Sequence, residues 1–175
     1  AQVDKYGNLN TTVIGDYEKP TMRLPGSGGA ADFISYAKRT VLTMRGGSFV
    51  NKLDYFTSPG YLDGGDSRDK TGLFPIGSGP SALISTKGIF RFDAITKEMY
   101  LSRIHPGVTL DSIKKDIPWE LKISPELAQT ERPTDEEIDF VRNFAPELSA
   151  GRELTVELRD AATRKKAEAR TGKNA

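Results

Sequence analysis

A glycine-rich segment, LPGSGGAADFI at residues 24–34, contains the residues whose types and spacing are best suited to chemistry. Because it leads directly into an apolar, helix-like run, Gly26, Gly28 and Gly29 would present bare backbone amides at the start of a helix. Such amides can approach and stabilise an anion, either a phosphate or the oxyanion of an acyl-transfer intermediate. An ordinary structural turn is the simpler interpretation of the glycines alone.

Most other kinds of catalytic site are disfavoured by residue type. The glycine-rich segment lacks the Lys-Ser/Thr of a P-loop and the Gly-x-Gly-x-x-Gly of a dinucleotide site. The chain has no cysteine and a single histidine, His105, which precedes a proline as turn residues often do, so no metal site is expected. Asp63 and Asp66 suit a turn. The acidic run 135–137 suits a helix N-terminus better than a catalytic carboxylate pair.

Composition and charge are those of an ordinary globular chain. Its 175 residues carry a net charge of +1, are 37% hydrophobic and include no apolar run long enough to span a membrane. Neither nucleic acid nor a membrane is therefore expected as a partner, and the sequence predicts a cytoplasmic protein. Because basic residues gather at the end, we expect a domain over 1–150 and a basic, helical or disordered tail over 151–175.

Apolar and β-branched runs alternate with glycine and proline along the chain. These runs predict strands at 40–44, 81–86, 88–93, 98–104 and 119–123, and a strand connection around the YGN turn. A helix over 31–38 is predicted directly after the glycines. Two further helices are expected to begin at Thr109 and at Thr134, where Glu137 completes a capping box. Strands that alternate with helices indicate a layered α/β domain.

Residues 52–80 form a long stretch in which glycine and proline recur too often for a regular element. Loops of this length inside a compact domain are commonly functional. The stretch also holds more large apolar side chains than a solvated loop needs, namely Tyr55, Phe56, Tyr61, Leu62 and Phe74. We expect Tyr55, Phe56 and Tyr61 to line an acyl pocket or to be buried against a partner subunit.

Four motifs, in the same order, resemble the β subunit or β-like half of family I coenzyme A transferases. GAADFISYAKRTVLTM, preceded by LPGSG, is similar to the Gly-x-Gly-Gly-Ala-x-Asp segment of that family. QVDKYGNLNTTVIG resembles the segment before it, and FVNKLDYFTSPGYLDG and IHPGVTLDSIKKDIPWELKI resemble the two that follow. The SPGYLDG form is more similar to the glutaconate transferase branch than to the 3-oxoacid branch.

The resemblance implies an open α/β/α fold, of which this chain would be the C-terminal portion, and a hetero-oligomer of α and β subunits. It also implies a covalent mechanism, in which a glutamate attacks an acyl-CoA, passes through an enzyme-bound CoA thioester and hands CoA to a carboxylate. The CoA thioester is then a substrate, and no tightly bound cofactor is expected. In the family the glycine-rich segment lies at this site, so Gly26, Gly28, Gly29 and Ala30 are carried over as backbone donors to acyl oxygen or CoA.

The nucleophilic glutamate of the family normally lies upstream of the QVDKYGN segment, and no glutamate of this chain matches its motif. We therefore expect the catalytic glutamate outside this chain, on a missing N-terminal β segment or on another polypeptide, and activity only in the complex. Acyl-CoA hydrolysis and ring cleavage are alternatives on the same fold. A non-catalytic CoA-binding or scaffolding module is another, whereas a sugar-phosphate isomerase is disfavoured because no general base matches one.

Overall fold

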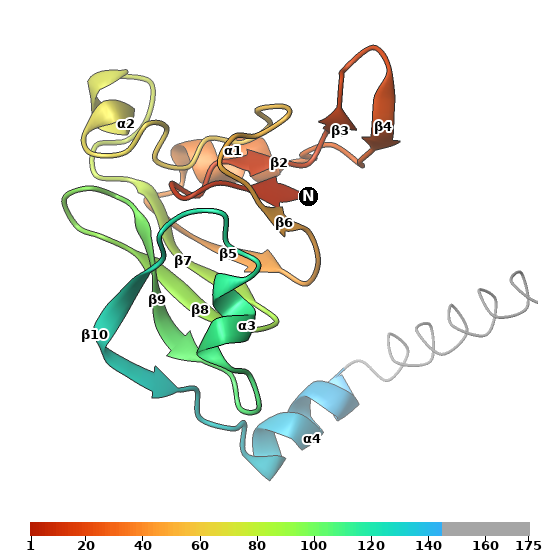
Figure 1. Cartoon of the computed structure of the whole chain (residues 1–175), viewed down its shortest axis with the longest axis vertical. Helices are drawn as coiled ribbons and strands as arrows, with labels where there is room; N and C mark the ends of the chain where they lie inside the picture. The colour runs from red at the N-terminus through yellow and green to blue at the C-terminus, as the bar shows by residue number, and fades with distance from the viewer. Residues whose placement is uncertain (145–175) are drawn as a thin grey trace, which may run out of the picture. The chain divides into compact units, whose positions relative to one another are not determined.

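The computed structural model describes residues 1–144, of which residues 1–130 belong to one compact unit. The centre of this unit is a five-stranded sheet in the order β10-β9-β8-β7-β5. Its strands are β5 (Arg39–Met44), β7 (Gly79–Ser85), β8 (Gly88–Phe92), β9 (Met99–Ile104) and β10 (Lys122–Gln129). β5 is parallel to β7 and β9 is parallel to β10, whereas β8 is antiparallel to both of its neighbours (Figure 1).

Two smaller sheets and three short helices complete this unit. One sheet pairs β2 (Leu9–Asn10), β1 (Gln2–Val3) and β6 (Ser48–Phe49) in that order, and β3 (Val13–Gly15) forms a hairpin with β4 (Pro20–Arg23). The helices are α1 (Ala30–Tyr36), α2 (Ser67–Lys70) and α3 (Leu110–Lys114). Residues 131–144 belong to a second unit and include α4 (Asp135–Phe144).

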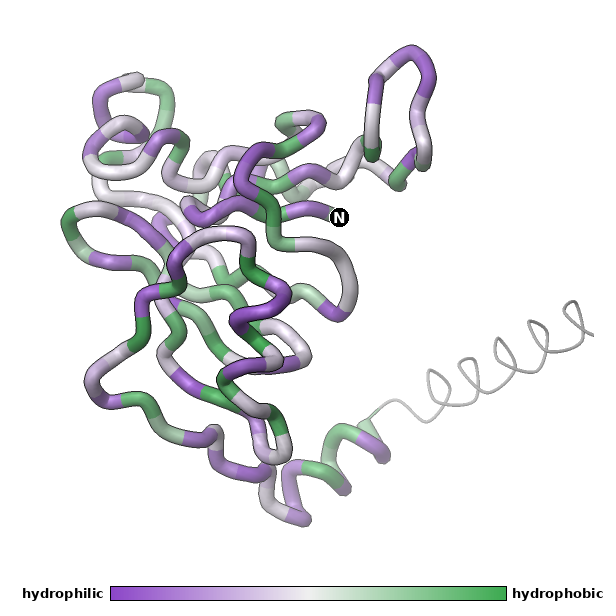
Figure 2. The backbone as a smooth tube through the Cα atoms, viewed as in Figure 1, coloured by the Kyte–Doolittle hydropathy of each residue, from purple (hydrophilic) through white to green (hydrophobic). Residues whose placement is uncertain are grey.

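One face of the five-stranded sheet carries the hydrophobic core. Leu83, Phe90 and Leu101 are fully buried and lie side by side on β7, β8 and β9. Val3 of β1 and Ile113 of α3 belong to the same cluster, so the small sheet and α3 cover this face together. Figure 2 shows hydrophobic residues along the central strands and α3, whereas the β3–β4 hairpin is largely hydrophilic.

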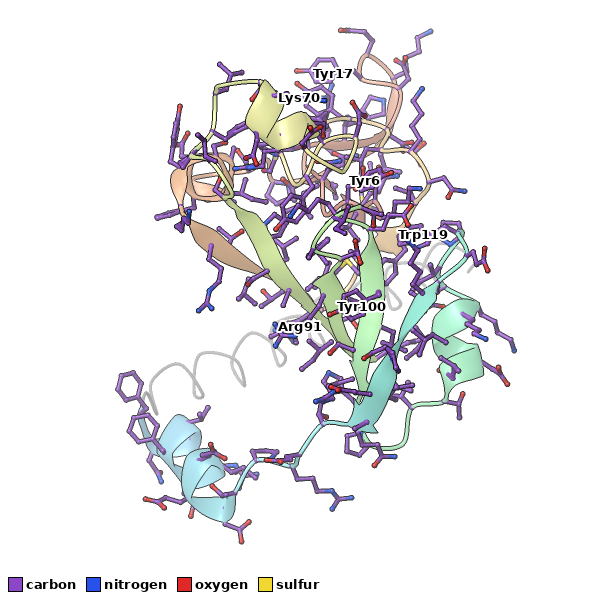
Figure 3. All side chains as sticks on the ribbon, turned by 90° about the vertical axis from the view of Figure 1, so that its left-hand side faces the viewer. Tyr6, Tyr17, Lys70, Arg91, Tyr100 and Trp119 are labelled. Carbon is purple, nitrogen blue, oxygen red and sulfur yellow. The ribbon has the colours of Figure 1, made fainter. Side chains whose placement is uncertain are left out.

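The opposite face of the sheet bears the side chains that alternate with the core residues. Val41, Ile84 and Arg91 lie there on three successive strands, and all three are exposed within the part of the chain that the structure describes. In Figure 3 Arg91 extends from the side of the sheet away from α3. Helix α3 therefore covers one face and leaves this one uncovered.

Most of the elements predicted from the sequence are confirmed. α1, β5, β7, β8 and β9 each begin and end within two residues of the predicted ranges. The predicted caps are present as well, because the Thr109 side chain accepts a hydrogen bond from the Ser112 amide, and Thr134 and Glu137 bond each other's amides. The alternation of strands and helices in the sequence was therefore sufficient to predict the α/β fold.

Two expectations about regular structure are wrong. The strand expected at 119–123 begins at Lys122 and runs to Gln129, because Trp119 packs on Phe49 and Leu121 is buried in the core, and neither residue pairs with β9. The segment 52–80 contains helix α2, although its composition predicts no regular element. In both cases the local composition is overridden by contacts with distant residues.

Only residues 131–144 of the second unit are described, so few of the expectations for this part of the chain can be compared with the structure. The predicted boundary at residue 150 and the predicted tail over 151–175 lie outside the described residues. Helix α4 exposes Phe140, Val141 and Phe144 in the part that is described. No helix within residues 1–144 combines the length and the hydrophobicity that crossing a membrane requires.

The core predicts a large loss of stability on truncation of Leu101, which is fully buried and pairs with Phe90 and Ile123 of the neighbouring strands. Leu101→Ala leaves a cavity in a packed interior, so we expect the free energy of unfolding to fall by about 2–5 kcal/mol. Urea denaturation followed by circular dichroism measures this loss. Ile95→Ala is the control, because Ile95 is 82% exposed and its truncation should change stability by less than about 0.5 kcal/mol. Equal losses in the two variants would contradict the assignment of the core.

Candidate functional site

The glycine-rich loop, residues 24–29, leads from the hairpin strand β4 into helix α1. Its first half is tied to the segment after β2, because the Leu24 amide donates to the Thr12 carbonyl (2.9 Å) and the Gly26 amide to the Thr11 carbonyl (2.7 Å). Gly26 has a φ of +87°, a left-handed conformation that favours glycine. This half of the loop is therefore fixed by main-chain hydrogen bonds.

The second half of the loop leaves two amides without an internal acceptor. Gly28 and Gly29 are exposed, and neither amide donates any of the hydrogen bonds found within residues 1–144. The next amide, that of Ala30, already donates to the Ser27 carbonyl (3.0 Å). A Cβ placed on Gly28 would meet no atom of the described residues within 4 Å. Of the four residues predicted as donors, Gly28 and Gly29 thus have amides that can serve a ligand, whereas those of Gly26 and Ala30 are engaged.

The residues that hold the loop are themselves held by Thr57. The Thr57 Oγ1 accepts from the Thr11 amide (3.0 Å) and lies 2.7 Å from the Thr12 Oγ1. Thr57 directly precedes the SPGYLDG stretch. The glycine-rich loop and the long segment, which the sequence singled out separately, are therefore parts of one assembly.

Arg68 of α2 joins the same long segment to helix α1, and sequence reasoning did not single it out. Its side chain is buried, with 2% of the residue exposed. The guanidinium donates to the Ile34 and Ser35 carbonyls in α1 (2.7 and 3.0 Å). It also donates to the Pro59 and Gly60 carbonyls (3.1 and 2.8 Å). One side chain therefore fixes the SPG stretch against the helix that follows the glycine-rich loop.

The surroundings of Arg68 are unusual for a buried cation. Its Nε donates to the Ser78 Oγ (3.2 Å), and the Phe74 ring centroid lies 4.0 Å from its guanidinium carbon. No salt bridge of the described residues involves Arg68. Desolvation lowers the pKa of this guanidinium, against smaller opposing effects of Tyr61 and Asp69. The sequence gives no signal of the burial, because GGDSRDKTG has the composition of a solvated loop.

The three aromatic residues predicted for a pocket or interface do not converge on one place. Tyr55 is 38% exposed and stacks on Tyr17, with ring centroids 5.4 Å apart. Tyr61 is half-buried and packs edge-on against Phe92 at 5.3 Å, within the same unit. Phe56 is exposed and borders a cavity. Their role in an acyl pocket or subunit interface stays a prediction.

The cavity beside Phe56 has a volume of about 520 Å³ and lies where the β1–β2 turn meets the long segment. Asn8 holds the two together, because its Oδ1 accepts from the Gly60 and Leu62 amides (2.8 and 3.1 Å) and its Nδ2 donates to Asp4 (2.7 Å). Burial raises the pKa of Asp4, and hydrogen bonds from Asn8 act in the opposite direction. The backbone of SPGYLDG is thus fixed on this side by the side-chain amide of Asn8.

The other residues considered for chemistry have structural roles. His105 bridges two segments, with Nε2 3.0 Å from the Ser85 carbonyl and Nδ1 2.9 Å from the Thr130 Oγ1. Asp66, the residue before α2, forms an exposed ion pair with Lys70 (3.0 Å), and Glu137 belongs to the capping box of α4. Across residues 1–144 there is no group of three side chains that would suit a metal ion.

Glu98 is already paired with two lysines. Its Oε1 accepts from Lys5 Nζ (2.8 Å) and its Oε2 from Lys122 Nζ (2.5 Å). These contacts, first that with Lys122 and then that with Lys5, lower the pKa of Glu98. The carboxylate therefore links the β1–β2 turn to β10, and both of its oxygens are engaged.

The glycine-rich loop and the long segment lie within a stretch shared with known proteins. The family model described as coenzyme A transferase matches residues 1–116. The chain belongs to the coenzyme A transferase family. It is 40% identical over 152 residues to one subunit of the 3-oxoadipate CoA-transferase of Pseudomonas knackmussii. It is 39% identical over 144 residues to one subunit of the glutaconate CoA-transferase of Acidaminococcus fermentans.

The similarity to other members of the family is extensive but covers part of their length. The two relatives cover 86% and 81% of this chain, whereas the chain spans 58% and 53% of theirs. The crystal structure of the glutaconate enzyme of A. fermentans matches with a TM-score of 0.74 at 36% identity, over 82% of this chain and 55% of that one. The predicted fold and the resemblance to the glutaconate branch are therefore confirmed.

A hydrolase subunit is also similar to this member of the coenzyme A transferase family. The cholesterol ring-cleaving hydrolase IpdB subunit of Mycobacterium tuberculosis is 29% identical over 151 residues, which cover 81% of this chain and 56% of that subunit. The fold is thus shared by subunits of transferases and of a hydrolase. Membership of the family alone does not distinguish the two reactions.

The pairing of Glu98 predicts a pH-dependent contribution to stability. The pKa of Glu98 in the fold lies below its ordinary value of 4.5. The ionised carboxylate therefore contributes its full stabilisation above pH 4.5, and this stabilisation is lost as the pH falls through the lowered pKa. We expect Glu98→Gln to lower the free energy of unfolding at neutral pH by up to about 1 kcal/mol, with a much smaller effect in acid. Urea titrations of the wild type and of Glu98→Gln, from neutral pH into acid, measure the difference in their free energies of unfolding. Glu120→Gln, at an exposed neighbour, is the control; an equal effect of Glu98→Gln at every pH would contradict the pairing.

Proposed function

We propose that this chain is the β-subunit part of an acyl-CoA:carboxylate CoA-transferase that works through a glutamyl-CoA thioester. The observation that carries the proposal is the pair of open amides at Gly28 and Gly29 in a chain of the coenzyme A transferase family. In this role the two amides donate to the carbonyl oxygen of the thioester as negative charge develops on it. The similarity to two transferase subunits, at 40% and 39% identity, supports this reaction.

The chemistry needs a nucleophile as well as an oxyanion site. A glutamate carboxylate attacks the carbonyl carbon of the donor acyl-CoA, and the CoA thiolate leaves as an acyl-glutamyl anhydride forms. The thiolate then attacks the glutamyl carbonyl, so that the donor acid is released and CoA becomes bound to the glutamate as a thioester. The reverse sequence with a second carboxylate gives the new acyl-CoA. Every addition places negative charge on a carbonyl oxygen, which is the charge that two backbone N–H groups stabilise.

We place the nucleophilic glutamate outside residues 1–175. Glu98 is paired with Lys5 and Lys122, and Glu137 is bound in the cap of α4. A CoA-transferase α subunit and a further β segment are the proposed partners, in keeping with the names of both relatives, each of which is one subunit of its enzyme. The substrates are an acyl-CoA and a carboxylate, and no tightly bound cofactor takes part.

A hydrolytic or ring-cleaving reaction at the same loop is a second candidate, favoured by the 29% identity to the ring-cleaving hydrolase subunit. In a hydrolase, water takes the place of the acceptor carboxylate. Incubation of the assembled enzyme with an acyl-CoA, with and without acetate or a dicarboxylate, distinguishes the two. A new acyl-CoA that appears only with the carboxylate supports transfer, and free CoA released without any carboxylate supports hydrolysis. Binding of CoA with neither product would indicate a non-catalytic module.

Gly28→Val should remove turnover while leaving the fold intact. The added side chain meets open space within the chain, yet it would block the approach of a thioester to the loop amides. We expect kcat of the assembled enzyme to fall by about 10² to 10³-fold, the effect of losing an oxyanion donor. Steady-state kinetics measure this fall, and circular dichroism checks the fold.

The matched control for this variant is Gly107→Val. Gly107 also has a left-handed φ, +81° against +51° at Gly28, and open space beside it. The two substitutions therefore impose a similar backbone strain, on the order of 1–2 kcal/mol. Retained activity in Gly107→Val and its loss in Gly28→Val would support the loop as the site. Equal activity in the two variants would exclude the loop from the reaction.

The covalent intermediate predicts where a trap will react. During turnover of the assembled enzyme, borohydride or hydroxylamine should attack the glutamyl-CoA thioester and stop the reaction, because a thioester is more reactive than a carboxylate. Peptide mass spectrometry then locates the modified glutamate, which we expect outside residues 1–175. Enzyme treated in the absence of acyl-CoA is the control and should stay unmodified. A modified glutamate within residues 1–175 would contradict the proposed division of the site.

A further inference from the structure

Arg68 lies at the junction of three chain segments. Its hydrogen bonds reach two carbonyls of α1, two carbonyls of the SPG stretch and the hydroxyl of Ser78. These five bonds use every N–H group that a guanidinium has. Because the side chain is 2% exposed, it has no capacity left for a ligand and does not contact substrate.

The carbonyls that Arg68 binds in α1 are ones that the helix cannot satisfy itself. The last four carbonyls of a helix have no intrahelical partner, and those of Ile34 and Ser35 lie within the last turn of Ala30–Tyr36. The C-terminal end of a helix also carries partial negative charge, which favours a nearby cation. The Arg68 guanidinium therefore fits the end of α1 both in its hydrogen bonds and in its charge.

Helix α1 has little else to hold it in place. It is 7 residues long, and Ile34 is its one buried residue. The large side chains of Phe33 and Tyr36 are 73% and 69% exposed. Hydrophobic packing within the described unit thus contributes little to the position of this helix, and the bonds to Arg68 contribute much of what fixes it.

The position of α1 determines the position of the two open amides. Gly29 is the residue directly before the helix, and its carbonyl accepts from the Phe33 amide (3.0 Å) in the first helical turn. On its other side the loop is fixed at Gly26 by Thr11. Gly28 and Gly29 are thus held between one anchor at Thr11 and a second anchor, through the helix, at Arg68.

We infer that Arg68 is a positioning residue for the reaction, which holds the Gly28 and Gly29 amides in register with the thioester by clamping the last turn of α1. The inference rests on the proposed function of these amides. A lysine cannot replace the arginine, because an ammonium has three donors on one atom and cannot reach acceptors arranged around a planar fork. A displacement of an oxyanion donor by about 1 Å is enough to lower a rate by about 10²-fold.

Hydrogen exchange of the assembled enzyme tests the clamp without reference to activity. In Arg68→Lys we expect the amides of residues 33–36, which the helix protects, to exchange at least about tenfold faster than in the wild type, because the local opening of α1 becomes easier. The amides of β8 and β9 should be unchanged, which also checks that the variant folds. Lys70→Ala, at an exposed position of α2 labelled in Figure 3, is the matched control and should exchange like the wild type. Unchanged exchange of residues 33–36 in Arg68→Lys would overturn the inference.

Kinetics test the consequence for the reaction. We expect Arg68→Lys to lower kcat by about 10 to 10²-fold with little change in KM for the acyl-CoA, because misplaced amides bind the ground state almost as well as the transition state. In Arg68→Ala, guanidinium ion at low, non-denaturing concentration should enter the vacated site and restore part of kcat, whereas ammonium ion should not. Restoration is a result that a merely unstable variant would not give.

The two levels of the hypothesis fail in different ways. If the wild-type enzyme transfers no CoA, the proposed function is wrong, and hydrogen exchange still decides whether Arg68 holds α1. If Gly28→Val is inactive but Arg68→Lys turns over like the wild type, the function stands and the positioning role is wrong. If Arg68→Lys loses protection throughout β8 and β9 and guanidinium restores nothing to Arg68→Ala, Arg68 supports the fold as a whole and the inference is overturned.

Discussion

The burial of one guanidinium among main-chain carbonyls fixes the irregular segments around the glycine-rich loop, and the order of the proposed site follows from it. A cation removed from water without compensation is strongly unfavourable, and Arg68 forms no salt bridge with a carboxylate of the described residues. The compensation comes from hydrogen bonds to a charged donor, which are stronger than neutral ones, and from the ring of Phe74 at 4.0 Å. The acceptors are carbonyls in irregular or helix-terminal backbone, which need donors of their own. The charge and the irregular segments therefore stabilise each other.

A second network of polar side chains performs the same task for the start of the chain. The Gln2 Oε1 accepts from the Asp54 amide and from the Asn10 Nδ2 (3.0 and 2.8 Å), and the Asp54 carboxylate accepts in turn from Gln2 and from the Gly15 amide (3.0 and 2.8 Å). Asn10 is fully buried, so its polar atoms have to be satisfied within the fold. Residues 51–62 form no strand, and hydrogen bonds from side chains of the first strands take the place of main-chain pairing there. A long segment with few backbone pairings becomes ordered in this way.

The two networks explain how a chain with a small core can present ordered main chain at its surface. Hydrophobic burial is concentrated on one face of the sheet, around Leu83, Phe90 and Leu101. No residue of the glycine-rich loop belongs to that core cluster, so hydrophobic burial there does not hold the loop directly. Its order comes from hydrogen bonds, which are directional, so the loop can be exposed and still hold its amides in a defined direction. An oxyanion site needs this combination, because its donors must face the substrate and must not reorganise during the reaction.

From the sequence alone one can predict the family, four of the strands of the large sheet and two helix caps, and the glycines that are proposed as part of the site stand out in it. Strands β5, β7, β8 and β9 carry local hydrophobic patterns. The caps at Thr109 and Thr134 depend on residues three positions apart. Glycines indicate a loop whose backbone amides no side chain shields. Only the tertiary structure decided which of those amides are open, because the engagement of Gly26 and Ala30 depends on Thr11 and on the course of the turn. It also decided that Arg68 is buried, since its acceptors lie up to 34 residues away in the sequence and no local pattern distinguishes it from a solvated arginine. Contacts of this kind are created when distant segments meet, so no pattern confined to neighbouring residues records them.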